Sequence, residues 1–280
     1  MKFASLRKFG KDYYIIQNLC RYMDVYSVLD SSSKLYIIKS FPEESKHQKF
    51  LYEIEINKKL NTSENNEFFV RYISSSIEEF FALEKYIVFE LCEKGPLSEY
   101  VKTCVHFEEI FLKIIFYKLL NIVFHMHRAD VVHMDISLKN IFIDCSYNFK
   151  LGGFDHSLIV SDKKNKNIYF RKDIIDLAFV FIQILTGKIL KNNKIIKKII
   201  QSGNSHSFWK VVEIQPYCDF HFPNDLKDLI NKMLFKKDIK LNDIENLLSH
   251  DWFKKIKNLN KNELKEYIEK EFIKFEEGEL

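Results

Sequence analysis

The most informative segment of the chain is Val132-His133-Met134-Asp135-Ile136-Ser137-Leu138-Lys139-Asn140-Ile141-Phe142-Ile143-Asp144. In it, Asp135 is followed five residues later by Asn140. The stretch lies in the second of two parts of the chain that differ in hydrophobic period. The first 90 residues read mostly as strands, and the residues after Phe107 read mostly as helices. We therefore predict an α+β protein with a small β-rich lobe and a larger α-helical lobe.

Strand-like runs dominate the first part. One segment between them, Glu43–Leu60, has helical spacing with Phe50 and Ile54 on its apolar face. The runs that we expect as strands are Tyr13–Leu19, Val25–Leu29, Lys34–Ser40, Phe69–Ser74 and Tyr86–Leu91. Together they predict the smaller lobe over about residues 11–91, with a connection to the second lobe at about residues 90–96.

Helical periods dominate the second part, which predicts the larger lobe over about residues 97–275 of a single 280-residue domain. In Lys188–Ile200, lysines such as Lys191 alternate with isoleucines. This pattern predicts an amphipathic helix with a solvated lysine face, and a membrane or acidic partner is the alternative use of that face. The predicted helices are Phe107–His127, Asp173–Thr186, Lys188–Ile200, Leu226–Phe235, Asn242–His250 and Lys261–Phe275.

The stretch 132–144 resembles the catalytic loop of eukaryotic protein kinases, in which His-Arg-Asp is followed five residues later by Asn. The resemblance implies the bilobal protein-kinase fold. It also implies that the Asp135 carboxylate accepts a hydrogen bond from the attacking hydroxyl, and that the Asn140 side chain holds magnesium.

Other segments resemble kinase motifs in the same order along the chain. Lys39 ends a run similar to the strand that carries the phosphate-binding lysine, and Glu53 stands where a helix-borne glutamate pairs with it. Tyr86–Cys92 resembles the hinge between the lobes, with Phe89 as gatekeeper. The resemblance implies ATP and magnesium as cofactors, with nucleotide contacts at Lys39, Glu53, Val25, Ile37, Phe89, Glu90, Cys92, Asn140 and Phe142.

Further likenesses lie downstream. Asp173–Ala178 is similar to the start of the buried central helix of kinases, and His250–Phe253 is similar to their closing His-Pro-Trp-Phe segment. Within the superfamily, His133–Ile136, Asn140–Ile143 and His156 resemble the Wee family of mitotic-inhibitor kinases.

The chain departs from the kinase pattern at the metal-binding motif. Gly153 stands where kinases carry the magnesium-binding Asp, and glycine has no carboxylate to offer. Asp155 follows two residues later, and two extended residues span roughly 7 Å. Asp155 is therefore expected to be displaced from the metal, and it replaces the missing ligand only if the turn is rearranged.

Other catalytic parts are also eroded. No glycine occurs between Lys11 and Lys94, so a plain turn replaces the glycine-rich loop. Ser137 replaces the catalytic-loop lysine, for which Lys139 is the candidate substitute or else a solvated surface residue. Ile37 replaces a small alanine and narrows the adenine slot. The segment from Gly153 to the predicted central helix is short and lacks Ala-Pro-Glu, so we expect the peptide-substrate platform to be lost.

Composition bounds the partners and the compartment. Lys+Arg is 43 against Asp+Glu 39 with few arginines, so nucleic acid is not an expected partner. The five scattered cysteines favour a reducing compartment, and we expect an intracellular protein of the cytoplasm or nucleus. Cys218 and His221 lack a second ligand pair, so no structural metal is expected. The apolar run Leu177–Leu185 is too short to span a membrane, and no membrane insertion is expected.

Two functions stay open at this point. In the first, the chain is a pseudokinase with weak or no phosphotransfer that acts as a scaffold or allosteric regulator of a protein partner, such as an active kinase or a cell-cycle component. In the alternative, it is a divergent active kinase that transfers the γ-phosphate of ATP to protein Ser, Thr or Tyr. That alternative uses Asp135 as base, Asn140 with a displaced Asp155 for magnesium, and the Lys39–Glu53 pair for the phosphates.

Overall fold

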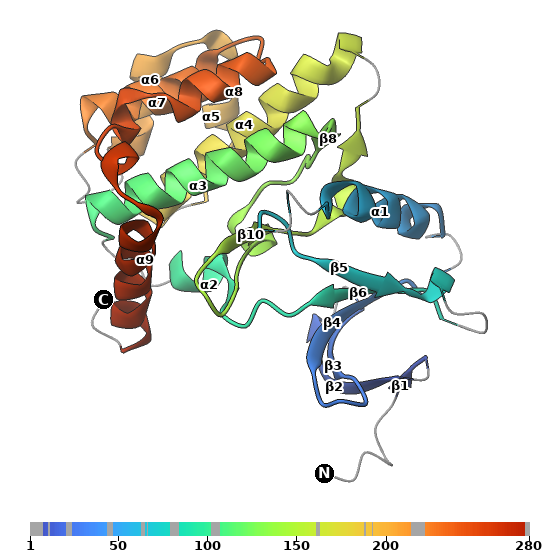
Figure 1. The fold of residues 1–280 in the computed structure, drawn as a ribbon. Coiled ribbons are helices and arrows are strands. Elements are labelled where there is room, and N and C mark those ends of the chain that lie inside the picture. The colour runs from blue at the N-terminus through green and yellow to red at the C-terminus, as the bar shows by residue number, and fades with distance from the viewer. Residues whose placement is uncertain are drawn as a thin grey trace.

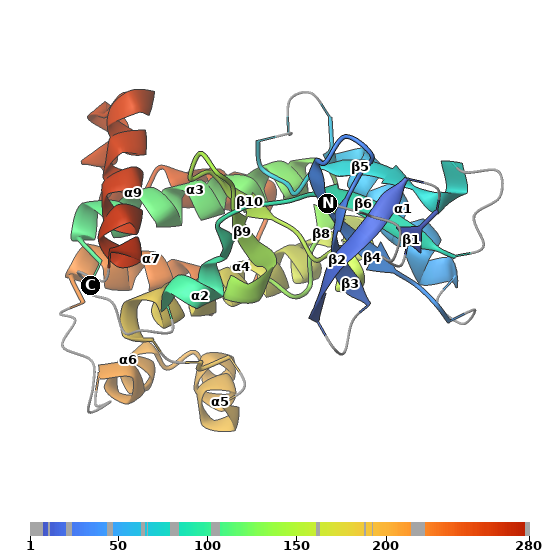
Figure 2. The same cartoon turned by 90° about the horizontal axis from the view of Figure 1, so that it is seen from below.

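The computed structural model describes residues 8–10, 12–20, 24–43, 47–62, 65, 67–78, 84–101, 107–160, 163–187, 189–191, 193–213 and 222–277. A β-rich lobe and a helical lobe lie side by side, with the N-terminus on the former and the C-terminus on the latter (Figures 1 and 2). The plain turn predicted in place of the glycine-rich loop, at residues 20–24, falls mostly outside the described ranges, and Cys218 and His221 lie outside them as well.

The smaller lobe is a curled antiparallel sheet with one helix, α1 (His47–Leu60), beside it (Figure 1). Its six strands follow the spatial order β1-β2-β3-β4-β6-β5. The centre of the sheet is buried because Val28, Ile38 and Val88 point to one face, as alternation along a strand requires. The strands are β1 (Lys8–Phe9), β2 (Tyr13–Cys20), β3 (Val25–Leu29), β4 (Leu35–Ser40), β5 (Tyr72–Ser75) and β6 (Tyr86–Glu90).

Short strands lie where the two lobes meet. β7 (Gly95–Pro96), β9 (Ile141–Ile143) and β10 (Phe149–Leu151) form one small sheet. β8 (Val131–Val132) and β11 (Leu158–Ile159) form another. These pairings bring the connection between the lobes, the 132–144 stretch and the Gly153 segment together at the inner edge of the larger lobe.

Helices build the larger lobe around α3 (Glu109–Arg128) and α4 (Lys163–Thr186). The rings of Phe116 and Phe181 stack between these two helices with centroids 3.8 Å apart. The remaining helices are α2 (Leu97–Val101), α5 (Lys194–Ser202), α6 (Ser205–Glu213), α7 (Asn224–Phe235), α8 (Leu241–Leu248) and α9 (Lys261–Glu276). α3 is long and apolar enough to cross a membrane, but 67% of its most apolar window is buried inside the protein, as in the central helix of a packed lobe.

Most predicted elements are present near their predicted bounds, and two are not. α4 begins at Lys163, well before the predicted start at Asp173, because the polar run that starts at Lys163 is helical and turns Phe170 into the core. The predicted helix Lys188–Ile200 is wrong at its start, since α5 begins at Lys194. α6 was not predicted, although its apolar residues Phe208 and Trp209 are buried.

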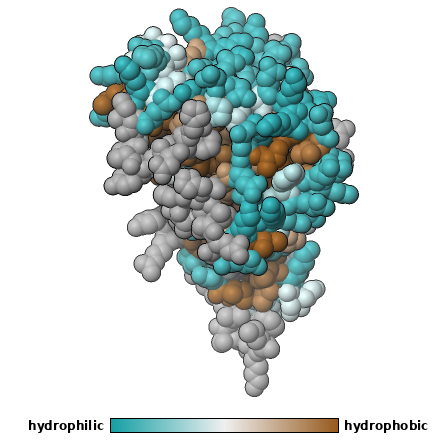
Figure 3. All heavy atoms as spheres, turned by 90° about the vertical axis from the view of Figure 1, so that its left-hand side faces the viewer, coloured by the Kyte–Doolittle hydropathy of each residue, from teal (hydrophilic) through white to brown (hydrophobic). Residues whose placement is uncertain are grey.

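The surface on the left-hand side of Figure 1 is mainly hydrophilic over its described part, with small hydrophobic patches between the polar regions (Figure 3). The apolar residues of the two lobes gather instead in buried clusters, of which the largest surrounds α3 and α4. Burial of this apolar area is the main stabilising contribution to the fold.

Asp173, on α4, fixes the start of the 132–144 stretch. Its fully buried carboxylate accepts hydrogen bonds from the backbone N–H groups of His133, at 2.8 Å, and Met134, at 2.7 Å. It also lies 2.8 Å from Nε2 of His127 on α3. Burial alone would raise the pKa of Asp173, but the contacts with His127 and His133 outweigh it and lower the pKa. The carboxylate is therefore ionised and joins two helices to the loop.

We expect Asp173→Asn to destabilise the protein by about 3 kcal/mol, since it removes a buried charge that satisfies several donors. Urea unfolding at pH 7 measures the loss. Glu245→Gln on the exposed side of α8 is the control and should change the free energy of unfolding by less than about 0.5 kcal/mol. Equal effects of the two substitutions would show that Asp173 is not the anchor of the loop.

Candidate active site

The catalytic-loop residues lie together after β8. The side chain of Asn140 donates from Nδ2 to the backbone carbonyl of Asp135 at 2.9 Å and lies 3.4 Å from the Asp135 carboxylate. A short helical turn, Leu138–Asn140, places Asn140 beneath Asp135. The five-residue spacing in the sequence therefore places the Asn140 side-chain amide next to the Asp135 carboxylate.

Two lysines hold the Asp135 carboxylate. Lys139 Nζ lies 3.2 Å from one oxygen, and Lys191 Nζ lies 3.2 Å from the other. Burial alone would raise the pKa of Asp135, but hydrogen bonds and charge from Lys139 and Lys191 outweigh it and lower the pKa. Asp135 is thus an ionised carboxylate with a cation on each side.

Lys191 is the residue that sequence reasoning placed wrongly. It lies before α5 rather than on its solvated face, and its ammonium contacts the buried Asp176 of α4 at 3.0 Å and the Ile136 carbonyl at 3.3 Å. Its ammonium therefore lies beside the loop in which Ser137 replaces the catalytic-loop lysine of kinases. Only the tertiary structure brings Lys191 there, because it is remote from Asp135 along the chain.

The Lys39–Glu53 pair is present and joins β4 to α1. Lys39 Nζ contacts the two carboxylate oxygens of Glu53 at 2.8 and 2.7 Å. The same ammonium also contacts the carboxylate of Asp155, whose side chain is 38% exposed. Burial alone would lower the pKa of Lys39, but the charges of Glu53 and Asp155 raise it. The cation expected at the phosphates thus already has two carboxylate partners.

Gly153 adopts a backbone conformation that suits glycine. Its φ is +76°, in the left-handed region, and a β-carbon built on it would lie 2.5 Å from Oδ1 of Asn140. Real β-carbons do not approach oxygen so closely, so a side chain at this position requires Asn140 to move. Asn140 Oδ1 therefore faces the place where kinases supply a carboxylate, and in this chain that place carries no side chain.

The ring of Phe154 packs the Gly153 segment against both lobes. Its centroid lies 5.2 Å from His133 and 6.1 Å from Phe69, which bridges to β10. His133 Nε2 lies 2.9 Å from the carbonyl oxygen of Gly152. Asn57 on α1 is fully buried and donates to the Glu53 carbonyl at 2.8 Å. The aromatic packing that holds the Gly153 segment against His133 and Phe69 is therefore in place.

Tyr52 is a second residue that the sequence did not single out. Its hydroxyl, on α1, accepts a hydrogen bond from the backbone N–H of Ile159 in β11 at 2.7 Å. Only residues 160–162 separate β11 from α4, so the segment between them is very short. Tyr52 therefore ties α1 to β11, while Asp155 ties the Gly153 segment to Lys39 of β4.

The expected nucleotide-contacting residues lie along the strands and the hinge. Val25 pairs with Lys39, and Ile37 pairs with Phe89, in neighbouring strands of the sheet. Phe142 lies on β9 opposite Pro96 of the hinge segment. All of these side chains are partly buried.

The polar hinge residues have protein partners. Glu90 accepts from Lys150 Nζ at 2.5 Å and from the Arg71 backbone N–H at 2.9 Å. Burial raises the pKa of the Cys92 thiol to about 12, so it is a neutral thiol at pH 7. Neither partner of Glu90, Lys150 or Arg71, was predicted from the sequence.

The residues at the expected magnesium site do not fit the ion. Mg²⁺ in phosphotransferases is bound by carboxylate and amide oxygens together with phosphates. Here Asn140 supplies an amide oxygen, Gly153 supplies none, and the nearby Asp155 carboxylate is paired with Lys39. Over the ranges given above for the structure, no group of three or more His, Cys, Asp or Glu side chains is arranged to hold a metal ion.

The protein kinase domain pattern matches residues 21–172, which is more than half of the 280 residues. The chain belongs to the protein kinase family. It is 23% identical over 84% of its length to a probable cell cycle serine/threonine-protein kinase CDC5 homolog of Encephalitozoon cuniculi, of which it covers 52%. It is also 23% identical over 88% of its length to the cell cycle serine/threonine-protein kinase CDC5/MSD2 of Saccharomyces cerevisiae, of which it covers 37%.

The kinase relatives are distant and longer than this chain. An Aurora kinase of Schizosaccharomyces pombe is 23% identical over 61% of the chain, which covers 51% of that protein. The chain thus spans about half, or less, of the length of these curated relatives. The bilobal α+β kinase fold is established for it, whereas the likeness to the Wee family stays a prediction.

We expect Gly153→Ala to cost more stability than Gly203→Ala. Both glycines have positive φ, so both substitutions carry a conformational cost of about 1–2 kcal/mol, but a β-carbon at Gly203 meets nothing within 4 Å. The contact with Asn140 should add about 1–3 kcal/mol at Gly153. Urea unfolding of both variants, and of Gly153→Ala combined with Asn140→Ala, measures this difference. If Asn140→Ala does not remove the excess, the contact is not its cause.

The contact between Asp155 and Lys39 predicts a pH dependence. Burial alone would raise the pKa of Asp155, but Lys39 outweighs it and lowers the pKa below the ordinary value of 3.8. The contact therefore stabilises the fold above that ordinary value, and its contribution is lost as the pH falls through the lowered pKa.

At pH 7, Asp155→Asn should cost about 0.5 kcal/mol, since the carboxylate is partly exposed. The difference from the native chain should shrink as the pH falls below the ordinary Asp value of 3.8 and through the lowered pKa of Asp155. Unfolding curves between pH 3 and 7 check this. A difference that is constant with pH would exclude ionised Asp155 as its source.

Proposed function

We propose that this chain is a pseudokinase, with weak or no phosphotransfer, that acts on a protein partner as a scaffold or allosteric regulator. The observation that carries the proposal is the state of the charges around Gly153. Gly153 stands in place of the magnesium-binding Asp of kinases, and Asn140 lies where a side chain at this position would begin. The nearby Asp155 is paired with Lys39. A bound metal typically contributes several kcal/mol to phosphotransfer, and each 1.36 kcal/mol is a factor of ten in rate.

The charge pairing supports the same conclusion. Lys39 is neutralised by Glu53 and Asp155, and Asp135 is neutralised by Lys139 and Lys191. In an enzyme, these groups would be needed for the phosphates and for the acceptor hydroxyl. Here they stabilise one another, and the Tyr52 hydroxyl joins α1 to β11.

A scaffold needs a binding surface with a fixed geometry, and two features of this chain favour such a surface. α1 is fixed by Lys39 and by the Tyr52 hydroxyl, so its exposed side has a defined position. The short segment between β11 and α4 leaves little chain for a peptide-substrate platform. A protein partner that recognises the shape of α1 and the neighbouring lobe fits these features.

The partner is proposed to be an active kinase or another cell-cycle component, and the site of action to be the cytoplasm or nucleus. The support is that two of the similar proteins carry the words cell cycle serine/threonine-protein kinase in their names. The proposal includes neither a nucleic-acid partner nor insertion into a membrane. A Wee-like role is the finer form of the same proposal and rests on the loop residues alone.

The alternative function is a divergent active protein kinase. It is favoured by the direct Lys39–Glu53 pair and by Asn140 beneath Asp135, which are arranged as phosphotransfer requires. It needs Asp155 to leave Lys39 and approach Asn140 when nucleotide binds. Metal-dependent nucleotide binding would be the sign of that rearrangement.

Thermal denaturation with ATP, with and without Mg²⁺ or Mn²⁺, separates the two functions. For a pseudokinase we expect no stabilisation that depends on the metal, because the carboxylate ligand is missing. A stabilisation that requires metal and is lost in Asp155→Asn would favour the active kinase. The matched control is Asp251→Asn, an exposed aspartate at the far end of the larger lobe.

Transfer of radiolabelled phosphate from ATP tests the same point directly. The native chain and Asp135→Asn are compared on a mixture of Ser-, Thr- and Tyr-containing peptides and for labelling of the chain itself. We expect equal background in both. Incorporation at least tenfold above the Asp135→Asn variant would overturn the pseudokinase proposal.

A further inference from the structure

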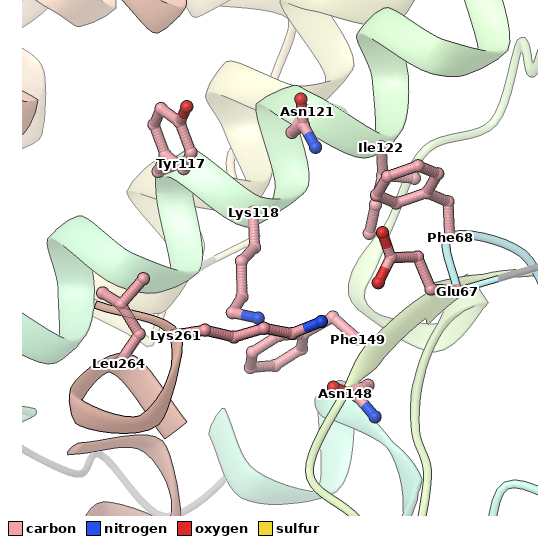
Figure 4. Close-up of a pocket in the computed structure, with 10 residues that line it drawn as sticks. All are labelled: Glu67, Phe68, Tyr117, Lys118, Asn121, Ile122, Asn148, Phe149, Lys261 and Leu264. Carbon is pink, nitrogen blue, oxygen red and sulfur yellow. The ribbon is translucent and has the colours of Figure 1, made fainter. Parts of the chain in front are cut away.

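A cavity of about 210 Å³ lies on the larger lobe, outside the kinase-like site. It lies where α3, the N-terminal end of α9, the turn before β10 and the segment after α1 come together (Figure 4). Its walls combine aromatic and aliphatic groups with a few polar ones, the composition expected of a small-ligand site. The lining residues are Glu67, Phe68, Tyr117, Lys118, Asn121, Ile122, Asn148, Phe149, Lys261 and Leu264.

Two lysine side chains, the half-buried Lys118 and the exposed Lys261, line this cavity. Lys118 reaches in from α3 and Lys261 from the first residue of α9, and Figure 4 shows their side chains running into the same space above the ring of Phe149. Across the described ranges, neither ammonium has a hydrogen bond or an ion pair. Burial lowers the pKa of Lys118, the charges of Glu67 and Asp144 oppose this shift without cancelling it, and the charge of Lys261 adds to it. A half-buried cation beside a second cation is destabilising unless an anion accompanies it.

The charge balance of the cavity favours an anion. Glu67 is the acidic residue of the lining, and it forms no ion pair with Lys118 or Lys261, so two cations face one separated carboxylate. Asn121 adds an amide that can donate a hydrogen bond. The ring of the half-buried Phe68 and the small accessible part of Phe149, which is 3% exposed, offer apolar surface to the rest of a ligand.

We propose that this cavity binds a small organic anion, with its phosphate or carboxylate group between Lys118 and Lys261 and its apolar body against Phe68 and Phe149. The volume limits the ligand to about the size of a single-ring compound. Bound there, it joins α9 to α3 and to the segment that follows α1. The inference is independent of whether the chain transfers phosphate.

The proposal is tested with phenyl phosphate, benzoate and inorganic phosphate, titrated into the full chain at constant ionic strength. Binding is measured by isothermal titration calorimetry and by nuclear magnetic resonance shifts of residues 117–122. We expect saturable binding of phenyl phosphate or benzoate that is at least threefold tighter than that of inorganic phosphate, because the ring buries apolar area. The comparison of phenyl phosphate with benzoate identifies the preferred anionic group.

Two substitutions that should change the affinity in opposite directions make the test specific. Lys118→Met should weaken binding at least tenfold, and Lys118→Arg should retain it. Glu67→Gln should strengthen binding severalfold, because it removes a like charge from the anion's surroundings. Lys197→Met, on the exposed side of α5, is the matched control and should leave the affinity unchanged.

Two outcomes would overturn the proposal. One is the absence of saturable binding of any of the three anions to a folded native chain. The other is equal affinity of the native chain, Lys118→Met and Glu67→Gln, which would indicate a general effect of salt rather than a site. If Lys118→Met does not fold, the Glu67→Gln and Lys118→Arg variants carry the same comparison.

Discussion

The buried carboxylate of Asp173 is the interaction on which the arrangement of the candidate site depends. It is fully buried and receives the backbone N–H groups of His133 and Met134, and it contacts the His127 side chain. A buried charge is tolerated only when its hydrogen-bond partners are in place, so the loop, α3 and α4 must take one relative position. Asp135 and Asn140 follow directly from this anchor.

A second set of charges decides what the site can do. Lys39 joins β4, α1 and the Gly153 segment through two carboxylates, while Lys191 joins Asp135 to Asp176. These pairs use the groups that a kinase directs at nucleotide and substrate. The skeleton of a phosphotransferase is therefore retained, and its charges are satisfied within the protein. This combination is consistent with selection for a stable shape, which the proposed scaffold role requires.

Much of the fold could be predicted from the chain because its signals are local. Val25–Leu29 was predicted with its observed bounds, and α3 and α9 within a few residues, since periods of two and 3.6 are written in the sequence. The start of α4 was wrong because its first turns are polar, and only the burial of Phe170 against the larger lobe makes them helical. The predicted helix Lys188–Ile200 began too early because Lys191 contacts Asp135 instead of lying on the helix.

The residues and their spacing were sufficient to predict the kinase family, the order of most elements, the pairing of Lys39 with Glu53 and the absence of a carboxylate at position 153. Each of these rests on residue identity and spacing along the chain. Only the tertiary structure decided that Asp155 contacts Lys39, that Lys191 reaches Asp135, that Tyr52 holds β11, and that Lys118 and Lys261 share a cavity. Those contacts join segments far apart in sequence, and their geometry is set by packing of whole elements, which no local pattern encodes.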